Sequence, residues 1–290
     1  MPHIVLIDGS NMLRRAYSVA VKEQDARGIE LGATALFSQM LAKLFRRMEA
    51  GKVAPSHAAI FFDPVREGTW RRKVFPAYKA DRDDYEEDYL IQVGMTMQMC
   101  DAIGLRNARF DSHEADDLLA AMTSKARHAG MRVSIISTDK DLMQLVGPGV
   151  MQFHPMQDKW FGAKEVLEKF GVGPDLLTDY MALTGDSGDG IPGAPGIGPK
   201  IAAEILQTAG SLDAVLEDPD LVKRKSAKAS IENNRDLILM SRRLVSFDVD
   251  SCPPLFAPET AMMPKAEIAK QKMEGFLLAR LQLQDPVPAL

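Results

Sequence analysis

Three short apolar runs each lead to an aspartate, and this pattern constrains the fold more than any other feature. The runs are His3–Ile7, Ala58–Phe62 and Val133–Ser137, and the acids that follow them are Asp8, Asp63 and Asp139. Short apolar runs predict buried strands, and the helical spacing of the segments between them predicts covering helices. We therefore expect a largely parallel sheet with helices on both faces. Because the carboxyl ends of parallel strands meet at one edge, the three carboxylates should converge there.

More acids gather at a predicted helix start and in two loops. Asp111–Glu114 predicts the helix start, with an aspartate cap and a glutamate three residues later. The helix dipole explains one or two acids at this place, but not three. The further acids are Glu114, Asp116, Asp117, Asp141, Asp186 and Asp189. Closely packed carboxylates repel one another and stay ionised together only beside cations, so the set predicts a metal site.

Nine acids form this predicted metal site. They are Asp8, Asp63, Glu114, Asp116, Asp117, Asp139, Asp141, Asp186 and Asp189. A single aspartate after a strand is more often a cap or turn residue, and only the combination favours metal. Oxygen ligands without a cysteine site or an obvious histidine pair favour Mg²⁺ or Mn²⁺ over Zn²⁺, and acids so dispersed exclude an EF-hand. Two ions about 3.5–4 Å apart can activate water and stabilise the leaving oxygen of a phosphodiester.

A glycine-rich turn precedes another predicted helix. It runs from Gly193 to Lys200 and leads into the apolar stretch Ile201–Leu206. Its glycines allow close backbone approach, and the amide groups at the helix start favour a phosphate, with a charge-assisted contact from Lys200. The alternative is a tight loop without a ligand; a Walker A loop is excluded because Pro199 breaks the pattern.

Two further stretches are charged. Residues 64–94 begin with basic and aromatic side chains and turn acidic from Asp83 to Asp88. We expect this segment to lie outside the core, because long charged excursions between core elements are usually functional or disordered. The second stretch, with Lys223 and Arg224, either binds a polyanion or forms a solvated helix face.

Composition sets the broad class. The 290 residues are 46% hydrophobic, which is enough for a substantial core. Two cysteines exclude a disulfide framework, the first apolar run is too short for a signal peptide, and no run approaches the ~20 residues that span a bilayer. We therefore expect a cytoplasmic protein. The net charge of −5 does not exclude nucleic acid, because neutralising nine carboxylates leaves an excess of positive charge.

Together these motifs resemble the 5′→3′ nuclease domain of bacterial DNA polymerase I and the related phage flap endonucleases. The matching stretches, in order along the chain, are Tyr78–Arg82, Glu114–Asp117, Ser137–Leu142, Thr184–Asp189 and Pro192–Lys200. Asp8 and Asp63 stand where the first two acids of the family belong. The resemblance implies an α/β fold with a mostly parallel central sheet flanked by helices (PIN-like), a helical arch and a helical helix–hairpin–helix (H3TH) region.

The resemblance also implies a division of the chain. Residues 1–175 would form the metal-dependent nuclease core, with the arch at about 64–94. Residues 176–250 would form the helix–hairpin–helix DNA-binding region, and residues 251–290 would pack on the core. The first five acids would surround one metal ion, and the last four would build the second metal region.

Further roles follow from the same resemblance. Lys79 and Arg82 would be catalytic and steer the scissile phosphate, while Tyr78 would stack on a base. The residues implied to bind the DNA backbone without reading bases are Gly196, Gly198, Lys200, Lys223 and Arg224. A K⁺ ion would bind near Ala194–Ile197 through the backbone carbonyls of Ala194 and Ile197.

The implied activity is a structure-selective 5′ nuclease, both flap endonuclease and 5′→3′ exonuclease, in DNA replication and repair. It would hydrolyse DNA with 5′ flaps, nicks or single-strand/duplex junctions by a two-metal-ion mechanism, as a monomer away from membranes. One alternative, a catalytically weak junction-binding protein, predicts missing carboxylates, and none of the nine is missing. Another, an RNA-directed nuclease of the same fold, needs neither the glycine-rich turn nor the basic arch. We expect no polymerase domain after Leu290; a free-standing enzyme and a fragment both stay open.

Overall fold

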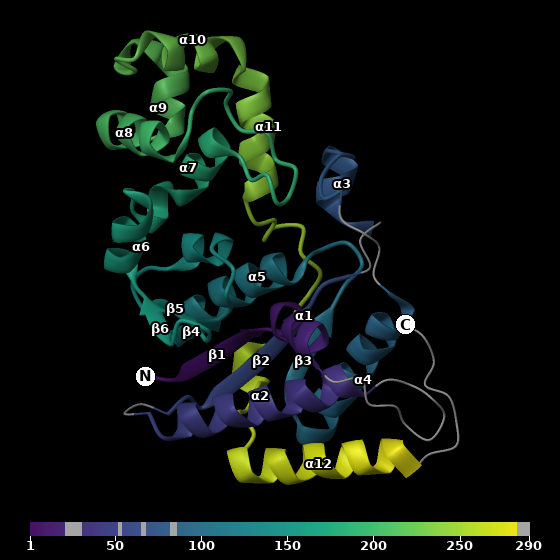
Figure 1. The fold of residues 1–290 in the computed structure, drawn as a ribbon. Coiled ribbons are helices and arrows are strands. Elements are labelled where there is room, and N and C mark those ends of the chain that lie inside the picture. Colours follow the sequence, from purple (N-terminus) through teal and green to yellow (C-terminus); the bar gives the residue numbers. More distant parts are fainter. Residues whose placement is uncertain (21–30, 52–53, 65–67, 82–85, 283–290) are drawn as a thin grey trace. The chain divides into compact units, whose positions relative to one another are not determined.

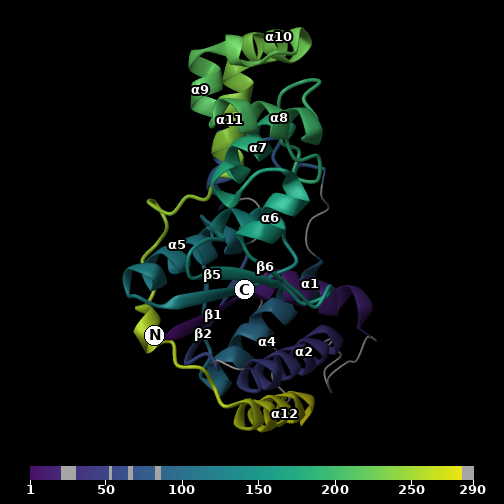
Figure 2. The ribbon, with the colours of Figure 1, turned by 90° about the vertical axis from the view of Figure 1, so that its left-hand side faces the viewer.

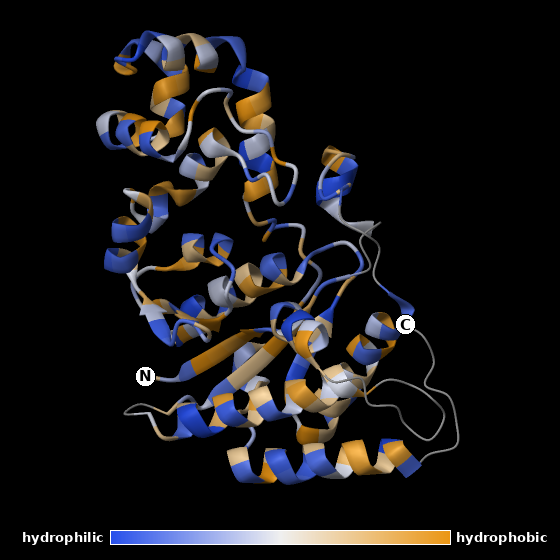
Figure 3. Ribbon diagram, in the orientation of Figure 1, coloured by the Kyte–Doolittle hydropathy of each residue, from blue (hydrophilic) through white to orange (hydrophobic). Residues whose placement is uncertain are grey.

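The N-terminal apolar run forms strand β1 (His3–Asp8) in a computed structural model that describes residues 1–20, 31–51, 54–64, 68–81 and 86–282. Strand β1 pairs in parallel with β2 (His57–Phe62) and β4 (Arg132–Ile136), and β2 pairs in parallel with β3 (Arg106–Arg109). Side chains Ile4 to Ile7 are fully buried, and the hydropathy colouring of β1 agrees (Figure 3). These four strands confirm the predicted mostly parallel α/β fold.

The chain divides into two compact units. Unit 1 contains residues 1–66, 84–138 and 249–290, and unit 2 contains residues 67–83 and 139–248. Residues 139–175, which we assigned to the nuclease core, lie in unit 2. The predicted three-part division by function stays a prediction.

Helices cover both faces of the parallel strands in unit 1. They are α1 (Gly9–Val19), α2 (Gly32–Glu49), α4 (Glu87–Ile103), α5 (Ala115–His128) and α12 (Ala266–Gln282), with a short 3₁₀ helix at Pro258–Thr260. Helix α5 packs against β1 and β4 on one face, and α2 and α4 lie on the other (Figure 1). The C-terminal helix α12 packs against α2 and α4, which is visible from a second direction in Figure 2.

The predicted start of α5 is wrong by three residues. Glu114 is the N-cap, its backbone N–H donates to Asp117 Oδ2 at 3.2 Å, and the capping box therefore joins Glu114 to Asp117. Asp111 is exposed, and a bridge between Phe110 and His113 precedes the helix. Two acids three residues apart occur at two places, as Asp111 with Glu114 and as Glu114 with Asp117. Asp111 lies in a turn before the helix, so the second pair forms the cap.

Unit 2 is mainly helical. Its helices are α3 (Trp70–Val74), α6 (Ala163–Phe170), α7 (Leu177–Thr184), α8 (Pro199–Ala209), α9 (Leu212–Glu217), α10 (Lys225–Asn233) and α11 (Arg235–Val245). Short 3₁₀ helices lie at Asp141–Leu145, Pro174–Leu176 and Pro219–Leu221. Strands β5 (Val150–His154) and β6 (Lys159–Phe161) pair antiparallel. Helix α7 packs against α8 and α11 around buried leucines and isoleucines.

The prediction that the segment at 64–94 lies outside the core is wrong for several of its residues. Trp70, Arg71 and Tyr78 are buried in unit 2. Arg71 is tolerated there because its guanidinium donates to the carbonyls of Leu244 (2.8 Å) and Ser246 (3.0 Å), and because it stacks on the Trp70 ring.

The acidic end of the segment is partly used in unit 1. The hydroxyl of Tyr17 lies 2.7 Å from Glu86 Oε2 and 2.5 Å from Asp88 Oδ1. Arg82, Asp83, Asp84 and Tyr85 lie outside the described residues, so the arch as a whole stays a prediction. No helix in the described part of the chain is long and apolar enough to cross a membrane.

Candidate active site and nucleic-acid interface

Asp8 lies where β1 ends and α1 begins. Its Oδ1 accepts a hydrogen bond from the Asn11 N–H at 2.9 Å, and its Oδ2 accepts one from Ser137 Oγ at 2.6 Å. Ser137 follows β4, the parallel neighbour of β1. The carboxylate is therefore fixed between two strand ends and is only 5% exposed. It caps a helix, as the simplest interpretation of its sequence position predicts, and it also lies at the predicted sheet edge.

Asp63 joins the end of β2 to the start of α5. Its N–H donates to Ser10 Oγ at 2.6 Å, and its Oδ1 accepts from the Ala115 N–H at 2.8 Å. The second bond places Asp63 beside the acids of the helix start. That Asp63 shares a metal site with Glu114, Asp116 and Asp117 stays a prediction.

The three acids at the start of α5 differ in exposure. Asp117 is fully buried and its Oδ2 is occupied by the capping bond to Glu114. Glu114 is 9% exposed, and Asp116 is half-buried. Asp117 therefore stabilises the helix start in this conformation, and its assignment as a metal ligand remains a prediction.

Asp139 and Asp141 form the start of the second acidic group, in unit 2. Asp139 Oδ1 accepts the Asp141 N–H at 2.8 Å, and the carbonyl of Asp139 accepts Gln152 Nε2 at 2.6 Å. Gln152 is fully buried on β5. Among the described residues, the buried oxygen Asp141 Oδ1 has no hydrogen-bond partner. A buried acceptor of this kind is costly unless a ligand satisfies it.

Asp186 and Asp189 lie in the loop between α7 and α8 and are paired with lysines. Lys140 Nζ lies 2.6 Å from Asp186 Oδ2, and Lys79 Nζ lies 3.5 Å from Asp189 Oδ2. The Tyr78 hydroxyl donates to the same Asp189 oxygen at 3.1 Å. The lysines compensate part of the negative charge of this group.

The electrostatics of unit 2 show that its four acids interact. Burial, together with the negative charges of Asp139, Asp186 and Asp189, raises the pKa of Asp141 to about 8. Burial likewise raises the pKa of Asp139. The hydrogen bond and charge of Lys140 outweigh burial at Asp186 and lower its pKa. A bound cation would relieve the repulsion among these carboxylates and favour the ionised form of Asp141.

The nine acids therefore form two groups, five in unit 1 and four in unit 2. Within the part of the chain that the structure describes, no three His, Cys, Asp or Glu side chains are already close enough to hold a metal ion. The residues nevertheless fit a hard divalent cation, because the donors are all oxygens and because the described residues offer the buried Asp141 Oδ1 no hydrogen-bond partner.

The glycine-rich turn connects α7 to α8. Gly196 has a φ of +77° and Gly198 is the N-cap of α8, with Pro199 in the first helical position. Lys200 and Gly196 are exposed. The helix start and its positive dipole end are thus exposed to solvent. Binding of a phosphate there stays a prediction.

The other predicted DNA-binding residues also lie in unit 2. Lys223 and Arg224 are exposed just before α10. Ala194 and Ile197 are buried, and the Ala194 carbonyl accepts the Ile197 N–H at 3.0 Å. The K⁺ site at these two residues stays a prediction. The Ala194 carbonyl, one of its two predicted ligands, already accepts this hydrogen bond within the turn.

The expected stacking of Tyr78 on a base does not fit this conformation. The side chain is 3% exposed and packs in the hydrophobic core of unit 2. Its ring lies under Lys79 Nζ at 4.8 Å, and Lys79 has a φ of +53°. Tyr78 instead supports Lys79 and Asp189, and Arg82 lies outside the described residues.

Sequence reasoning missed the polar residues that hold the acids in place. Ser10 and Ser137 each flank a strand-end acid, and Lys140 lies between two predicted ligands. Their closeness in sequence to the acids was a signal that they belong to the site, but it did not show their partners, because Ser10 bonds Asp63, Ser137 bonds Asp8 and Lys140 pairs with Asp186. Gln152 offered none, because its bond to Asp139 depends on how β5 folds back on the loop.

Comparisons with known proteins bear on the family of this chain. The family model for the N-terminal resolvase-like domain of 5′-3′ exonucleases matches residues 3–171, and the model for their C-terminal SAM fold matches residues 172–267. The DNA polymerase I of Rhizobium leguminosarum is 39% identical over 251 residues, which are 86% of this chain and 25% of that protein. The flap endonuclease Xni of Serratia proteamaculans is 34% identical over 86% of this chain and 94% of its own length.

A solved structure shows the same fold. The flap endonuclease of bacteriophage T5, in a complex with DNA and metal ions, covers 97% of this chain and 100% of its own with a TM-score of 0.69 at 17% identity. The predicted resemblance is confirmed by the family models and by the full-length relative. The chain belongs to the 5′-3′ exonuclease and flap endonuclease family.

Proposed function

We propose that this chain is a structure-selective 5′ nuclease that hydrolyses DNA phosphodiesters near single-strand/duplex junctions with the help of divalent metal ions. The observation that carries the proposal is the acidic group of unit 2, where four carboxylates interact and where the buried Asp141 Oδ1 has no hydrogen-bond partner in the described part of the chain. A structural role alone gives no reason to concentrate charge at this cost. The names of the matched relatives support the same activity.

Mg²⁺ or Mn²⁺ fits the donors best. The five acids of unit 1 would hold one ion, and the four of unit 2 would build the second region. When bound, such ions lower the pKa of water and stabilise the leaving oxygen of a phosphodiester. The T5 relative was solved with DNA and metal ions, which supports both partners for this chain.

The protein's own residues orient the acids and bind the substrate. Ser137 and Asn11 fix the Asp8 carboxylate, and the Ala115 N–H fixes Asp63. Lys79 and Lys140 neutralise Asp189 and Asp186. We infer that Lys79 turns to the scissile phosphate when a substrate is present, because a phosphate oxygen is a stronger partner than a carboxylate 3.5 Å away. Arg82 would contact the same phosphate.

The helix–hairpin–helix turn binds the duplex backbone in this proposal. The amide groups at the start of α8 and the charge of Lys200 contact phosphate, and Gly196 and Gly198 allow close approach. Lys223 and Arg224 extend the contact, and K⁺ at the carbonyls of Ala194 and Ile197 would add positive charge. Contacts of this kind select DNA structure and not base sequence. We expect the active protein to be a monomer.

One assay tests the proposed function. The full chain is incubated with a 5′-flap DNA and with a blunt duplex, each with Mg²⁺, Mn²⁺ or a chelator. We expect cleavage of the flap near its junction with either metal and none with the chelator. Flap DNA left intact with every metal would refute the proposal, and equal cleavage of both DNAs would refute structure selectivity.

A further inference from the structure

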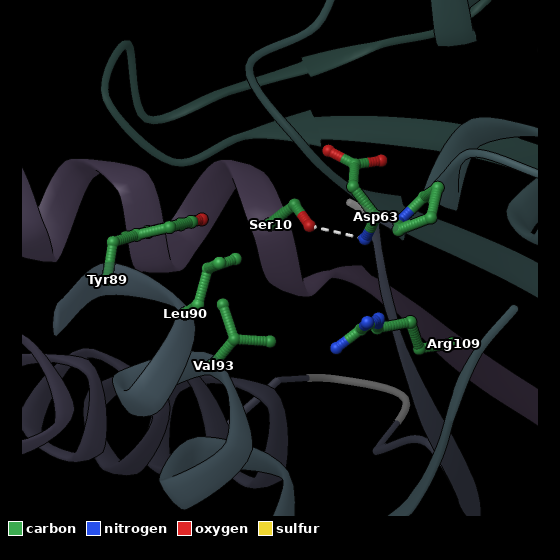
Figure 4. A pocket seen from close by; sticks show the side chains of 7 residues that line it. Ser10, Asp63, Tyr89, Leu90, Val93 and Arg109 are labelled. Carbon is green, nitrogen blue, oxygen red and sulfur yellow. Dashed lines mark hydrogen bonds between the residues drawn. The ribbon is translucent and has the colours of Figure 1, made fainter. Parts of the chain in front are cut away.

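A small pocket lies at the carboxyl ends of strands β2 and β3 in unit 1 (Figure 4). Its lining includes Ser10, Asp63, Tyr89, Leu90, Val93 and Arg109. The cavity volume is about 10 Å³, which is the room of about one water molecule. A nucleobase does not fit into such a space, but a single oxygen atom of a larger group does.

The fold places a basic residue beside one of the predicted metal acids. Strands β2 and β3 pair in parallel with Phe62 opposite Arg109. Asp63 follows Phe62, so the carboxylate and the guanidinium arise from neighbouring strand ends. Ser10, in the first turn of α1, is tied to the same place because its Oγ accepts the Asp63 N–H at 2.6 Å.

The Arg109 side chain is largely buried but weakly paired. It is 12% exposed, and its ion-pair partner among the described residues is Asp111, 3.8 Å away. The Asp111 side chain is 89% exposed, so water screens the pair and it contributes little. Figure 4 shows the guanidinium end of Arg109 directed into the pocket, toward Val93. A guanidinium has five N–H donors, which leaves several for a ligand.

Ser10 supplies a second donor. Its oxygen accepts from Asp63, and a hydroxyl that accepts one bond still has its own hydrogen to donate. Among the described residues, the structure shows no acceptor for that hydrogen. Tyr89, Leu90 and Val93 also line the pocket, and the apolar side chains of Leu90 and Val93 strengthen a charge-assisted bond there.

We propose that Ser10 and Arg109 form a subsite for a phosphate oxygen, which holds the single strand of the substrate beside Asp63. The inference rests on the proposed function, because Asp63 repels a phosphate until a cation compensates its charge. The ligand is a phosphate and not a base, since the cavity has room for about one oxygen atom and both donors line it. Arg109 is then a substrate-binding residue.

The first test measures binding without catalysis. Inorganic phosphate is titrated into the full chain, with and without Mg²⁺, while the ¹⁵N signals of the arginine Nε–H groups are recorded. The Arg109 signal is assigned by its loss in Arg109→Gln. We expect it to shift with phosphate while that of Arg106, an exposed arginine on the same strand, does not. An Arg109 signal that stays in place under both conditions overturns the subsite.

The second test measures which phosphate binds. Cleavage of 5′-flap DNA is followed in single-turnover reactions, with one neutral methylphosphonate at each position near the junction, and with a 5′-phosphate or 5′-hydroxyl end. We expect Arg109→Gln to lower the rate constant divided by the dissociation constant by roughly tenfold to hundredfold. Arg106→Gln is the matched control, and Arg109→Lys should recover part of the loss because it keeps the charge.

The proposal predicts non-additivity at one phosphate. The parent protein should lose rate when that phosphate is made neutral, and Arg109→Gln should lose nothing further there. A loss at the 5′ end instead of an internal linkage would assign the subsite to the terminal phosphate. Equal losses on every DNA would overturn the subsite and leave Arg109 a structural residue. If the parent cleaves no flap, the proposed function fails, while the phosphate titration still decides the subsite.

Discussion

At the scale of single residues, the site is defined by acids whose charge is only partly compensated. Asp186 and Asp189 have lysine partners, whereas the buried Asp141 Oδ1 has no hydrogen-bond partner among the residues that the structure describes. The raised pKa of Asp141 follows from burial and from its acidic neighbours. The same features that would favour a cation make the metal-free fold less stable.

Asp141→Asn should stabilise the metal-free protein in a pH-dependent way. The pKa of Asp141 is about 8 in the fold, above its ordinary value of 3.8, so the folded state holds its proton more tightly than the unfolded state. The bound proton contributes to the stability of the fold. This contribution is fully present below the ordinary pKa of 3.8 and is lost as the pH rises through about 8. We expect the variant to melt at a higher temperature than the parent at pH 8.5, with a smaller difference at pH 5.

The matched control for this melting experiment is Asp250→Asn, which neutralises an exposed acid. It should leave the melting temperature nearly unchanged at both pH values. Added Mg²⁺ should raise the melting temperature of the parent and much less that of Asp141→Asn. A variant that melts below the parent at pH 8.5 would contradict the cost assigned to the Asp141 carboxylate.

At the scale of elements, the connection between α7 and α8 has two features. Its backbone at Gly193 packs tightly against the end of α7, and the start of α8 is exposed. Gly193 has a φ of +63°, and a Cβ there would collide with the backbone of Thr184 and Gly185. Strain of this kind costs about 1–3 kcal/mol or more. Gly193→Ala should therefore lower the denaturant midpoint clearly. Gly147→Ala should leave the midpoint nearly unchanged, because a Cβ at this position meets open space. Similar midpoints for the two variants would contradict the close packing at Gly193.

The exposed start of α8 should contribute one ionic contact to DNA. Lys200→Ala should weaken binding of a duplex in any sequence and reduce the slope of log affinity against log salt by about one. Lys272→Ala, which removes an exposed lysine from α12, is the control. Affinity titrations from low to physiological salt measure both. An unchanged slope for Lys200→Ala would exclude this residue from the interface.

At the scale of the whole molecule, the sequence predicted the repeating features and missed the tertiary ones. Strands β1, β2 and β4 and their terminal acids were predictable because buried parallel strands are short, apolar and followed by polar loops. The burial of Arg71 and Tyr78 was not predictable, since it depends on the Leu244 carbonyl of α11 and on Asp189, each more than 100 residues away along the chain. The start of α5 was misplaced because the cap signal occurs twice.

We infer that the acids perform metal-dependent chemistry and do not merely hold the fold. The most direct measurement compares the parent with the double variant Asp186→Asn and Asp189→Asn, for single-turnover cleavage and for binding of the same 5′-flap DNA with Mg²⁺. We predict that the rate falls roughly a hundredfold or more, while the dissociation constant changes only a few-fold. Equal losses of rate and binding would contradict the claim.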